Sequence, residues 1–278
     1  MSHKKTVLVT GCGDGGIGSA LAKEFHTQGF RVFATSRPLD SMQELSALGI
    51  ETLELDVTAI DAIRRVRDDI ATKTCGKLDV LVNNAQVNAN SLTYPVAVTD
   101  MDMSAVRALY ELNVFAPMCM VQEFIRLLIS SGKARIVNIG SVSGIMPVPF
   151  SAAYNTSKAA LHAFGNTLRV ELAPFNGVKS SIVKPNSIPD TSLYKSMENV
   201  YQEKRINMSQ DNAMPTDKYA RIVVAETMKA KPRRRWGVWF LDTFLPRTVV
   251  DWVTARMFGF SEFSVHIRNA KDEHAQKT

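Results

Sequence analysis

Along residues 1–185, short uninterrupted runs of apolar residues alternate with stretches in which apolar residues recur every three or four positions. The runs are rich in β-branched residues and too short for helices, as expected of strands buried on both faces of a parallel sheet. Alternating strands and helices predict an α/β fold of the Rossmann type, a doubly wound parallel sheet. The predicted strands span residues 6–10, 31–35, 52–55, 80–83, 135–139 and 179–184, and the predicted helices span 17–28, 59–74, 99–130 and 153–173.

The pattern changes after the sixth predicted strand. Residues 186–215 are mostly polar, which is typical of a loop with short helices. A helical pattern returns over residues 216–229, and the aromatic run 236–240 is suited to a strand at the edge of the sheet. Apolar residues then recur at helical spacing near the C-terminus. We therefore predict a single domain over residues 1–240 and a C-terminal amphipathic helical extension over 241–278.

Composition narrows the class of protein. The three cysteines share no CxxC spacing, so we expect neither a disulfide framework nor a metal site. The apolar run near the N-terminus is too short for a signal peptide, and no stretch of about 18 residues is both apolar and uncharged. We therefore expect a cytoplasmic protein without a membrane-spanning helix. The net charge of +6 lies mainly in residues 195–278, which contribute +5, so an electrostatic partner should contact this tail. We expect no nucleic-acid partner.

A glycine-rich segment, TGCGDGGIG, joins the first strand to the first helix at residues 10–18. At such a junction the chain turns tightly, and a pyrophosphate approaches the backbone N–H groups of the helix only where side chains are absent. The spacing GxGxxG occurs twice here, and its place between strand and helix makes it a stronger signal than the motif alone. The segment predicts a dinucleotide-binding loop, with a flexible glycine turn as the alternative.

The second strand ends at Ser36 and Arg37, where an NAD-binding protein would carry an acidic residue for the ribose 2′-hydroxyl group. A guanidinium group suits a 2′-phosphate because it forms paired, charge-assisted hydrogen bonds. We therefore predict NADP(H) as the cofactor. The alternative is that Arg37 is a solvated surface residue.

Tyr154 and Lys158 are four residues apart in a helical pattern, so they lie on one face of the helix, and Ser141 lies within reach of that helix. A tyrosine that exchanges a proton near pH 7 needs its pKa lowered by about three units from about 10, and a neighbouring ammonium group favours the phenolate. The serine hydroxyl can hydrogen-bond a substrate oxygen while a nicotinamide transfers a hydride. Taken alone, however, the YxxxK spacing is common and mostly structural.

Together these motifs resemble the short-chain dehydrogenase/reductase family over residues 5–240. The resemblance implies that Tyr154 is the general acid and that Ser141 orients the substrate carbonyl. It also implies that Lys158 binds the ribose and lowers the pKa of the tyrosine, and that Asn113 holds a water linking this lysine to solvent. The matching pieces are TGCGDGGIG, LDV at 55–57, VNNA at 82–85, Asn113, Ser141 and YNTSK at 154–158.

The same resemblance implies which residues surround the cofactor. Asp56 and Val57 would contact the adenine, Asn84 and Ala85 would line the floor of the site, and residues 186–215 would form a substrate loop. The implied cofactor contacts are Gly11, Gly16, Ile17, Gly18, Ser36, Arg37, Asp56, Val57, Asn84, Ala85, Tyr154, Lys158, Ile188 and Thr191.

Three positions depart from the family pattern. Four residues rather than three separate Gly11 from Gly16, which predicts a bulge at Gly13–Asp14. Gln86 replaces the glycine of the usual NNAG, and Asn186 replaces the glycine that usually follows the proline after the sixth strand. Both replacements add a polar side chain near the active cleft. They keep open a non-redox isomerisation or cyclisation on the same fold. A non-catalytic binding or scaffold protein is a further alternative.

Several nearby residues are open to a structural interpretation. We interpret His162, one turn after Lys158, as a packing or capping residue rather than a proton relay. Cys12 is interpreted as a small buried residue. Met146, Phe150 and Tyr194 suit either the substrate wall or ordinary packing.

Within the family the chain is most similar to fungal reductases of 1-acyldihydroxyacetone phosphate and to tailoring reductases of secondary metabolism. This similarity implies a lipophilic small-molecule ketone of the acyl-dihydroxyacetone phosphate, steroid or polyketide type. We also expect a homo-oligomer. In the tail, four cations precede two tryptophans in KPRRRWGVWF, which suits peripheral attachment to the endoplasmic reticulum or to lipid droplets. The alternative is that residues 236–240 form the last strand and the following helix covers the cleft or a dimer contact.

Overall fold

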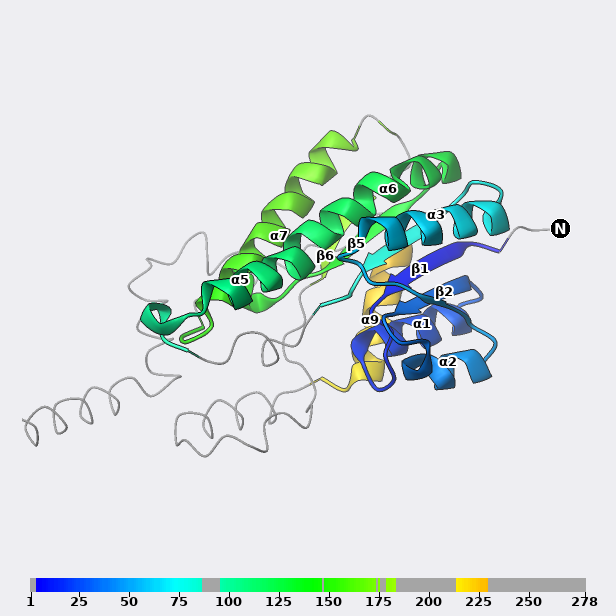
Figure 1. Ribbon diagram of the computed structural model, residues 1–278. Coiled ribbons are helices and arrows are strands. Elements are labelled where there is room, and N and C mark those ends of the chain that lie inside the picture. Colours follow the sequence, from blue (N-terminus) through cyan, green and yellow to red (C-terminus); the bar gives the residue numbers. More distant parts are fainter. Residues whose placement is uncertain are drawn as a thin grey trace, which may run out of the picture.

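Six parallel strands form one sheet in the order β3-β2-β1-β4-β5-β6 (Figure 1). The computed structural model describes residues 4–86, 96–146, 148–173, 175, 179–183 and 214–229. The chain moves outward from β1 to β3, returns to pair β4 with the other edge of β1, and moves outward again to β6. The predicted doubly wound Rossmann-type sheet is confirmed. The strands are β1 (Thr6–Thr10), β2 (Arg31–Ser36), β3 (Glu51–Glu54), β4 (Val80–Asn83), β5 (Arg135–Ile139) and β6 (Lys179–Val183).

The uninterrupted apolar runs are explained by burial on both faces of the sheet. In β1, Leu8 joins the half of the core that lies against α3, α6 and α7, whereas Val7 and Val9 join the half against α1 and α9. Successive side chains of a strand point to opposite faces, so a strand covered on both sides needs apolar residues at every position.

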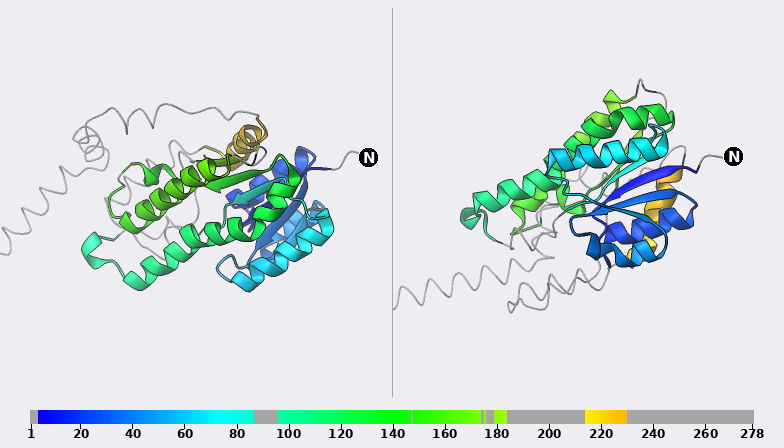
Figure 2. Two further views of the ribbon diagram at one scale, coloured as in Figure 1. Left: turned by 90° about the horizontal axis from the view of Figure 1, so that it is seen from above. Right: turned by 45° about the vertical axis from the view of Figure 1, so that its right-hand side comes forward.

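Helices cover both faces of this sheet (Figures 1 and 2). The predicted helices agree with the observed ones to within two residues at each end, apart from the long stretch at 99–130. The short helix α2 and the 3₁₀ turn Leu39–Met42 before it were not predicted. One face carries α1 (Ile17–Thr27), α2 (Gln43–Ala47) and α9 (Thr216–Met228), and the other carries α3 (Ile60–Thr74), α6 (Ala116–Ser131) and α7 (Ala152–Glu171).

The long helical stretch is not one regular helix. It begins with α5 (Met103–Tyr110), continues through a π-helical segment at Glu111–Phe115 and ends with α6. By length and hydropathy, the stretch Met103–Ser131 could cross a membrane, although no such helix was expected. Half of its most apolar window is buried inside the fold, and Phe124 and Leu128 of α6 are fully buried in the core. The apolar character of this helix therefore serves the packing of the sheet.

Several sequence predictions fall outside the described residues. These include nearly all of the loop at 186–215, the strand at 236–240 and the extension at 241–278. Among the predicted cofactor contacts, Ile188 and Thr191 also lie there.

Candidate active site

The glycine-rich loop between β1 and α1 has positions that accept no side chain. Gly11 adopts a positive φ of 72°, and a Cβ atom there would lie 2.7 Å from Cα of Ala85. A Cβ atom on Gly18 would lie 2.1 Å from the carbonyl oxygen of Gly11. The end of β1, the start of α1 and the end of β4 are therefore in direct backbone contact, which only glycine allows.

The extra residue of this loop forms a turn where the bulge was predicted. The N–H group of Gly16 donates to the carbonyl of Gly13 at 3.1 Å, closing a turn through Asp14 and Gly15. The N–H group of Asp14 donates to the carbonyl of Ser41 at 2.7 Å, in the 3₁₀ turn before α2. The bulge is thus supported by a segment whose role the sequence did not reveal.

Asn84 and Ala85 are held against the end of β1. The N–H groups of both residues donate to the hydroxyl oxygen of Thr10, at 3.0 and 2.9 Å. The side-chain amide of Asn84 donates to the carbonyls of Thr10 at 2.8 Å and Gly11 at 3.0 Å. Through these two hydrogen bonds, Asn84 holds the start of the glycine loop in place. Thr10 joins the two strand ends, and the sequence reasoning missed this role.

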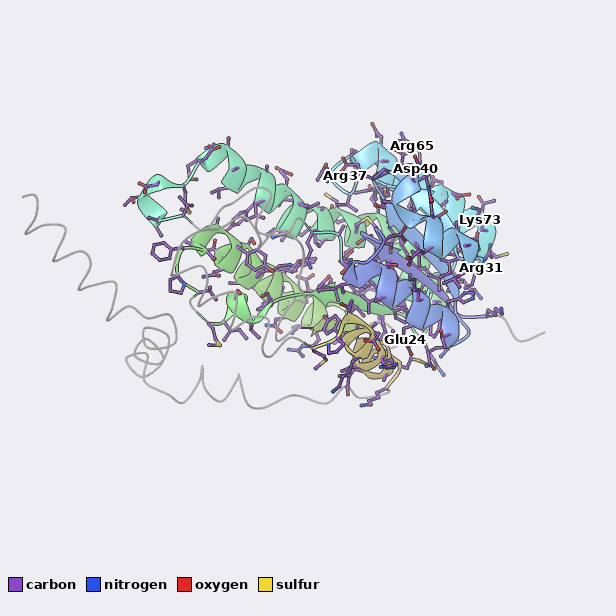
Figure 3. All side chains as sticks on the ribbon, turned by 90° about the horizontal axis from the view of Figure 1, so that it is seen from below. Glu24, Arg31, Arg37, Asp40, Arg65 and Lys73 are labelled. Atoms are coloured by element: carbon purple, nitrogen blue, oxygen red, sulfur yellow. The ribbon has the colours of Figure 1, made fainter. Side chains whose placement is uncertain are left out.

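The predicted adenosine end of the site lies beyond β2 and β3. Arg37 is exposed at the C-terminal end of β2, whereas Arg31 and Lys73 lie together at the opposite end (Figure 3). Asp56 accepts hydrogen bonds from the backbone N–H and the hydroxyl of Thr58. These bonds, with a smaller contribution from the charge of Arg37, lower the pKa of the Asp56 carboxyl group. The hydroxyl groups of Ser36 and Ser41 are 2.9 Å apart, which ties the end of β2 to the turn that supports the glycine loop.

The π-helical segment turns Asn113 inward toward α7. Asn113 is fully buried, and its side-chain amide donates to the hydroxyl oxygen of Ser157 at 3.1 Å. That hydroxyl donates in turn to the backbone carbonyl of Tyr154 at 2.8 Å. The side-chain oxygen of Asn113 is buried without a hydrogen-bond partner in the described part of the chain. A free buried acceptor at this point is what a bound water would require.

Lys158 is buried beside Tyr154, one helical turn along α7. Its ammonium nitrogen lies 5.6 Å from the centre of the Tyr154 ring and donates to the carbonyl of Ile139 at 3.1 Å. It also donates to the side-chain oxygen of Gln86. Burial lowers the pKa of Lys158 to about 7. The ammonium group thus lies next to the tyrosine in an environment where its charge is weakly screened.

Ser141 follows β5 and lies against α7, as predicted. Its hydroxyl oxygen accepts a hydrogen bond from the N–H group of Ser143 at 3.2 Å, and its own N–H group donates to Nε2 of His162 at 3.4 Å. A Cβ atom on Gly144 would lie 2.7 Å from the His162 ring and 2.8 Å from the backbone carbon of Lys158. His162 therefore supports the loop that carries Ser141, in agreement with the packing or capping role expected for it.

Other titratable or strained residues surround this set. Burial raises the pKa of the Cys12 thiol to about 12, so Cys12 is a buried and unreactive residue. Burial, with a smaller contribution from Tyr154, raises the pKa of Tyr219 in α9. Phe150 has a φ of 56°, a conformation that β-carbon-bearing residues rarely adopt, and its carbonyl accepts from the N–H group of Val96. This strained residue lies two positions before the start of α7 at Ala152, and either the substrate wall or ordinary packing accounts for it.

The arrangement fits a phosphorylated nicotinamide dinucleotide. The glycine loop leaves space at the start of α1, where the N-cap residue, Gly16, has no side chain to cap the first N–H groups of the helix. Val57 is buried next to the half-buried Asp56, and Arg37 offers an exposed cation nearby. Lys158 has three N–H donors, of which two are used within the described part of the chain. The described residues therefore offer the glycine loop for a pyrophosphate, Arg37 for a 2′-phosphate and one N–H donor of Lys158 for a ribose hydroxyl.

Comparisons with known proteins agree with this geometry. The sequence profile of the short chain dehydrogenases matches residues 5–201. The short-chain dehydrogenase RED1 of Pyricularia oryzae is 40% identical over 276 residues, covering 92% of this chain and 95% of the relative. The NADPH-dependent 1-acyldihydroxyacetone phosphate reductase of Schizosaccharomyces pombe is 39% identical over 238 residues, covering 80% and 76%.

Solved structures give the same result. A short-chain dehydrogenase from Streptomyces avermitilis superposes with a TM-score of 0.73 at 27% identity, covering 96% of this chain and 99% of that one. ElxO with NADP bound superposes with a TM-score of 0.71 at 27% identity, covering 84% and 94%. The chain belongs to the short-chain dehydrogenase/reductase family and is an NADP-dependent oxidoreductase.

Proposed function

We propose that the protein reduces the carbonyl group of a lipophilic small molecule, with Tyr154 as the general acid. The observation that carries this proposal is the buried ammonium group of Lys158 beside the Tyr154 ring. A positive charge at this position favours the phenolate form of the tyrosine and so makes its proton easier to release. Proton donation by a positioned side chain typically accelerates such a reaction by about 10²–10⁴-fold.

The residues that would hold the cofactor follow from the site. The glycine loop around Gly11, Gly16 and Gly18 would bind the pyrophosphate, and Arg37 would bind the 2′-phosphate. The free N–H group of Lys158 would bind a ribose hydroxyl. NADPH, when bound, supplies the hydride that the carbonyl carbon receives.

Side chains of the protein would orient the substrate and transfer the proton. The Ser141 hydroxyl donates a hydrogen bond to the substrate oxygen and holds it near Tyr154. The Tyr154 hydroxyl then gives its proton to the same oxygen as negative charge develops there. The buried oxygen of Asn113 suits a water that passes a proton onward from Lys158.

The substrate class follows from similarity rather than from contacts. The relative from S. pombe is named for 1-acyldihydroxyacetone phosphate, and several other relatives are short-chain dehydrogenases of filamentous fungi. A ketone with an apolar body, of the acyl-dihydroxyacetone phosphate, steroid or polyketide type, is the substrate we propose.

A ketone panel with NADPH tests this function. Absorbance at about 340 nm, the band of the reduced nicotinamide, should fall with at least one lipophilic ketone, and the product should be the corresponding alcohol. A product formed without consumption of NADPH would instead favour an isomerisation or cyclisation. Absence of both would favour a binding protein and overturn the proposal.

We also propose a cytoplasmic homo-oligomer whose C-terminal tail contacts a lipid surface of the endoplasmic reticulum or of lipid droplets. The positive charge and tryptophans of residues 231–240 support this proposal, because cations meet anionic headgroups and tryptophan favours the membrane interface. Such a location would bring the enzyme to lipophilic substrates.

A further inference from the structure

Gln86 extends from a rigidly held strand end into the catalytic site. The two residues before it are fixed by hydrogen bonds from their N–H groups to the hydroxyl of Thr10. Ala85 is also packed against Gly11, where a Cβ atom would clash with its backbone. Gln86 itself is half-buried. The backbone directly before Gln86 therefore has little freedom, which limits the directions that its side chain can take.

The side-chain oxygen of Gln86 accepts a hydrogen bond from the ammonium group of Lys158. The other acceptor of this group is the carbonyl of Ile139, at the end of β5. Ile139 is the last residue of β5, and Gln86 lies three residues after Asn83, the last residue of β4, which pairs with β5. An ammonium group has three N–H donors, so the two acceptors fix its direction and, among the described residues, leave one donor for a ligand.

The two hydrogen-bond acceptors, Gln86 and Ile139, bear on the charge state of Lys158 because of the groups that surround it. Its surroundings contain Tyr154 and His162 on the same helix, and Tyr219 of α9 interacts with Tyr154. Within the described part of the chain, no carboxylate offsets the burial that lowers the pKa of Lys158 to about 7. A buried ammonium group without a counter-ion keeps its charge only through hydrogen bonds to neutral acceptors.

We propose that Gln86 is a positioning residue for the reduction, whose side-chain oxygen holds the Lys158 ammonium group in its charged form beside Tyr154. This inference rests on the proposed function for its effect on turnover, and on the described contacts for its effect on Lys158. A glycine at this position, as in the usual NNAG, has no side chain to accept this hydrogen bond. In this chain the Gln86 side chain would therefore accept a hydrogen bond from Lys158 that, in an enzyme with glycine here, only solvent or a ligand could accept.

The charge state of Lys158 can be measured directly in the cofactor-free protein. Lysine labelled with ¹³C at Cε reports ionisation by its NMR shift, and the Lys158 signal is assigned by its absence in Lys158→Arg. Gln86→Met keeps the length of the side chain and removes the acceptor, whereas Gln86→Glu keeps the acceptor and adds a negative charge. Gln28→Met, an exposed site at the end of α1, is the matched control.

The midpoint of the Lys158 titration should fall by about one pH unit in Gln86→Met, because hydrogen bonds to charged groups are of that strength. It should rise in Gln86→Glu and stay unchanged in Gln28→Met. A midpoint in Gln86→Met that equals the wild-type value would overturn the proposal, and thermal melting of each variant establishes that it is folded. This measurement needs no substrate, so it stands even if no ketone is reduced.

Turnover provides the second readout. With a ketone that the wild type reduces, Gln86→Met should lose about tenfold in kcat with little change in KM. The alkaline limb of its pH profile should move to lower pH, and that of Gln86→Glu to higher pH, since the limb reports the coupled Tyr154–Lys158 pair. Tighter binding of NADPH by Gln86→Met at unchanged kcat would show that Gln86 blocks the ribose position, and would refute the positioning role.

Discussion

The side-chain amide of Asn113 donates a hydrogen bond to the hydroxyl oxygen of Ser157 over 3.1 Å, joining the π-helical segment to α7. Both residues are fully buried, and the Ser157 hydroxyl passes the link on to the backbone of Tyr154. Asn113 is therefore connected to the helix that carries the proposed acid through Ser157, a residue of the YNTSK motif to which the sequence reasoning gave no role. We expect Ser157 to position both residues.

Replacing this serine tests the connection. Ser157→Ala leaves the buried amide of Asn113 unpaired, so we expect a loss of about 1–3 kcal/mol in the free energy of unfolding. We also expect kcat to fall several-fold. Urea denaturation and steady-state kinetics check the two effects. Thr156→Ala is the matched control, because among the described residues its hydroxyl bonds only to carbonyls of its own helix. An equal loss in both variants would contradict the role of Ser157.

Tyr154→Phe removes the proposed proton donor and little else. We expect the rate of ketone reduction to fall by about 10²-fold or more, with binding of NADPH nearly intact. Stopped-flow turnover and quenching of NADPH fluorescence measure the two quantities. If more than about a tenth of the wild-type rate remained, Tyr154 would not be the general acid.

Arg37→Asp exchanges a cation for an anion at the proposed 2′-phosphate position. We expect the preference for NADPH over NADH to weaken or reverse, because the carboxylate repels the phosphate and suits a ribose hydroxyl group. The ratio of kcat/KM for the two cofactors, compared between the wild type and the variant, is the direct measurement. An unchanged ratio would place the phosphate elsewhere, most simply against the bulged loop around Asp14.

Lys158→Met should stabilise the cofactor-free fold while abolishing activity. Burial lowers the folded-state pKa of Lys158 from 10.5 to about 7, so the unfolded chain binds the extra proton between these values. Stability of the wild type therefore rises with pH across this window. The variant should exceed the wild type by a few kcal/mol at about pH 6, and the difference should shrink as the pH approaches about 10.

Urea denaturation over this pH range checks that prediction. Lys77→Met, at an exposed lysine, serves as the control for exchanging a lysine for a methionine. A gain in Lys158→Met that did not depend on pH would indicate better packing of methionine rather than removal of a buried charge.

The proposed contact of the tail with membranes is tested by flotation. With liposomes that contain anionic lipid, the full chain should float at low salt and release at high salt, because attraction to headgroups is screened. A version that ends before Pro246 retains the cluster of cations and lacks the amphipathic extension. It should bind more weakly. If the intact chain stays with the soluble fraction at low salt, the attachment proposal fails.

The sheet and the proximity of Tyr154 to Lys158 were predictable because their signals are local. A strand such as β1 needs apolar residues on both faces, and the pair Tyr154 and Lys158 needs only helical spacing. Gly11 and Gly18 likewise mark a backbone approach that any side chain would prevent. Each of these features can be recognised from a few consecutive residues.

The supporting contacts were not predictable because they join segments far apart in the sequence. Ser41 supports the bulged loop with its backbone carbonyl, a group that every residue carries. Gln86 was noted as an unusual residue, but its contact with Lys158, 72 positions away, depends on how β4 and α7 meet. The five-residue helix α2 is too short for its periodicity to stand out from a turn.

Because of the π-helical segment, the number of residues in the helix Met103–Ser131 decides where Asn113 lies relative to α7. A π turn contains one residue more than the α-helical turn it replaces, and each residue of an α-helix advances the chain by about 100°. Deleting a single residue from Glu111–Phe115 would replace the π turn by an ordinary α-helical turn and keep α5 and α6 continuous and in register. The side chains of this turn would then be spaced differently toward α7, and we expect the contact between Asn113 and Ser157 to be lost. Homologous chains that lack this one residue can align well in sequence and still have a different wall at the catalytic site.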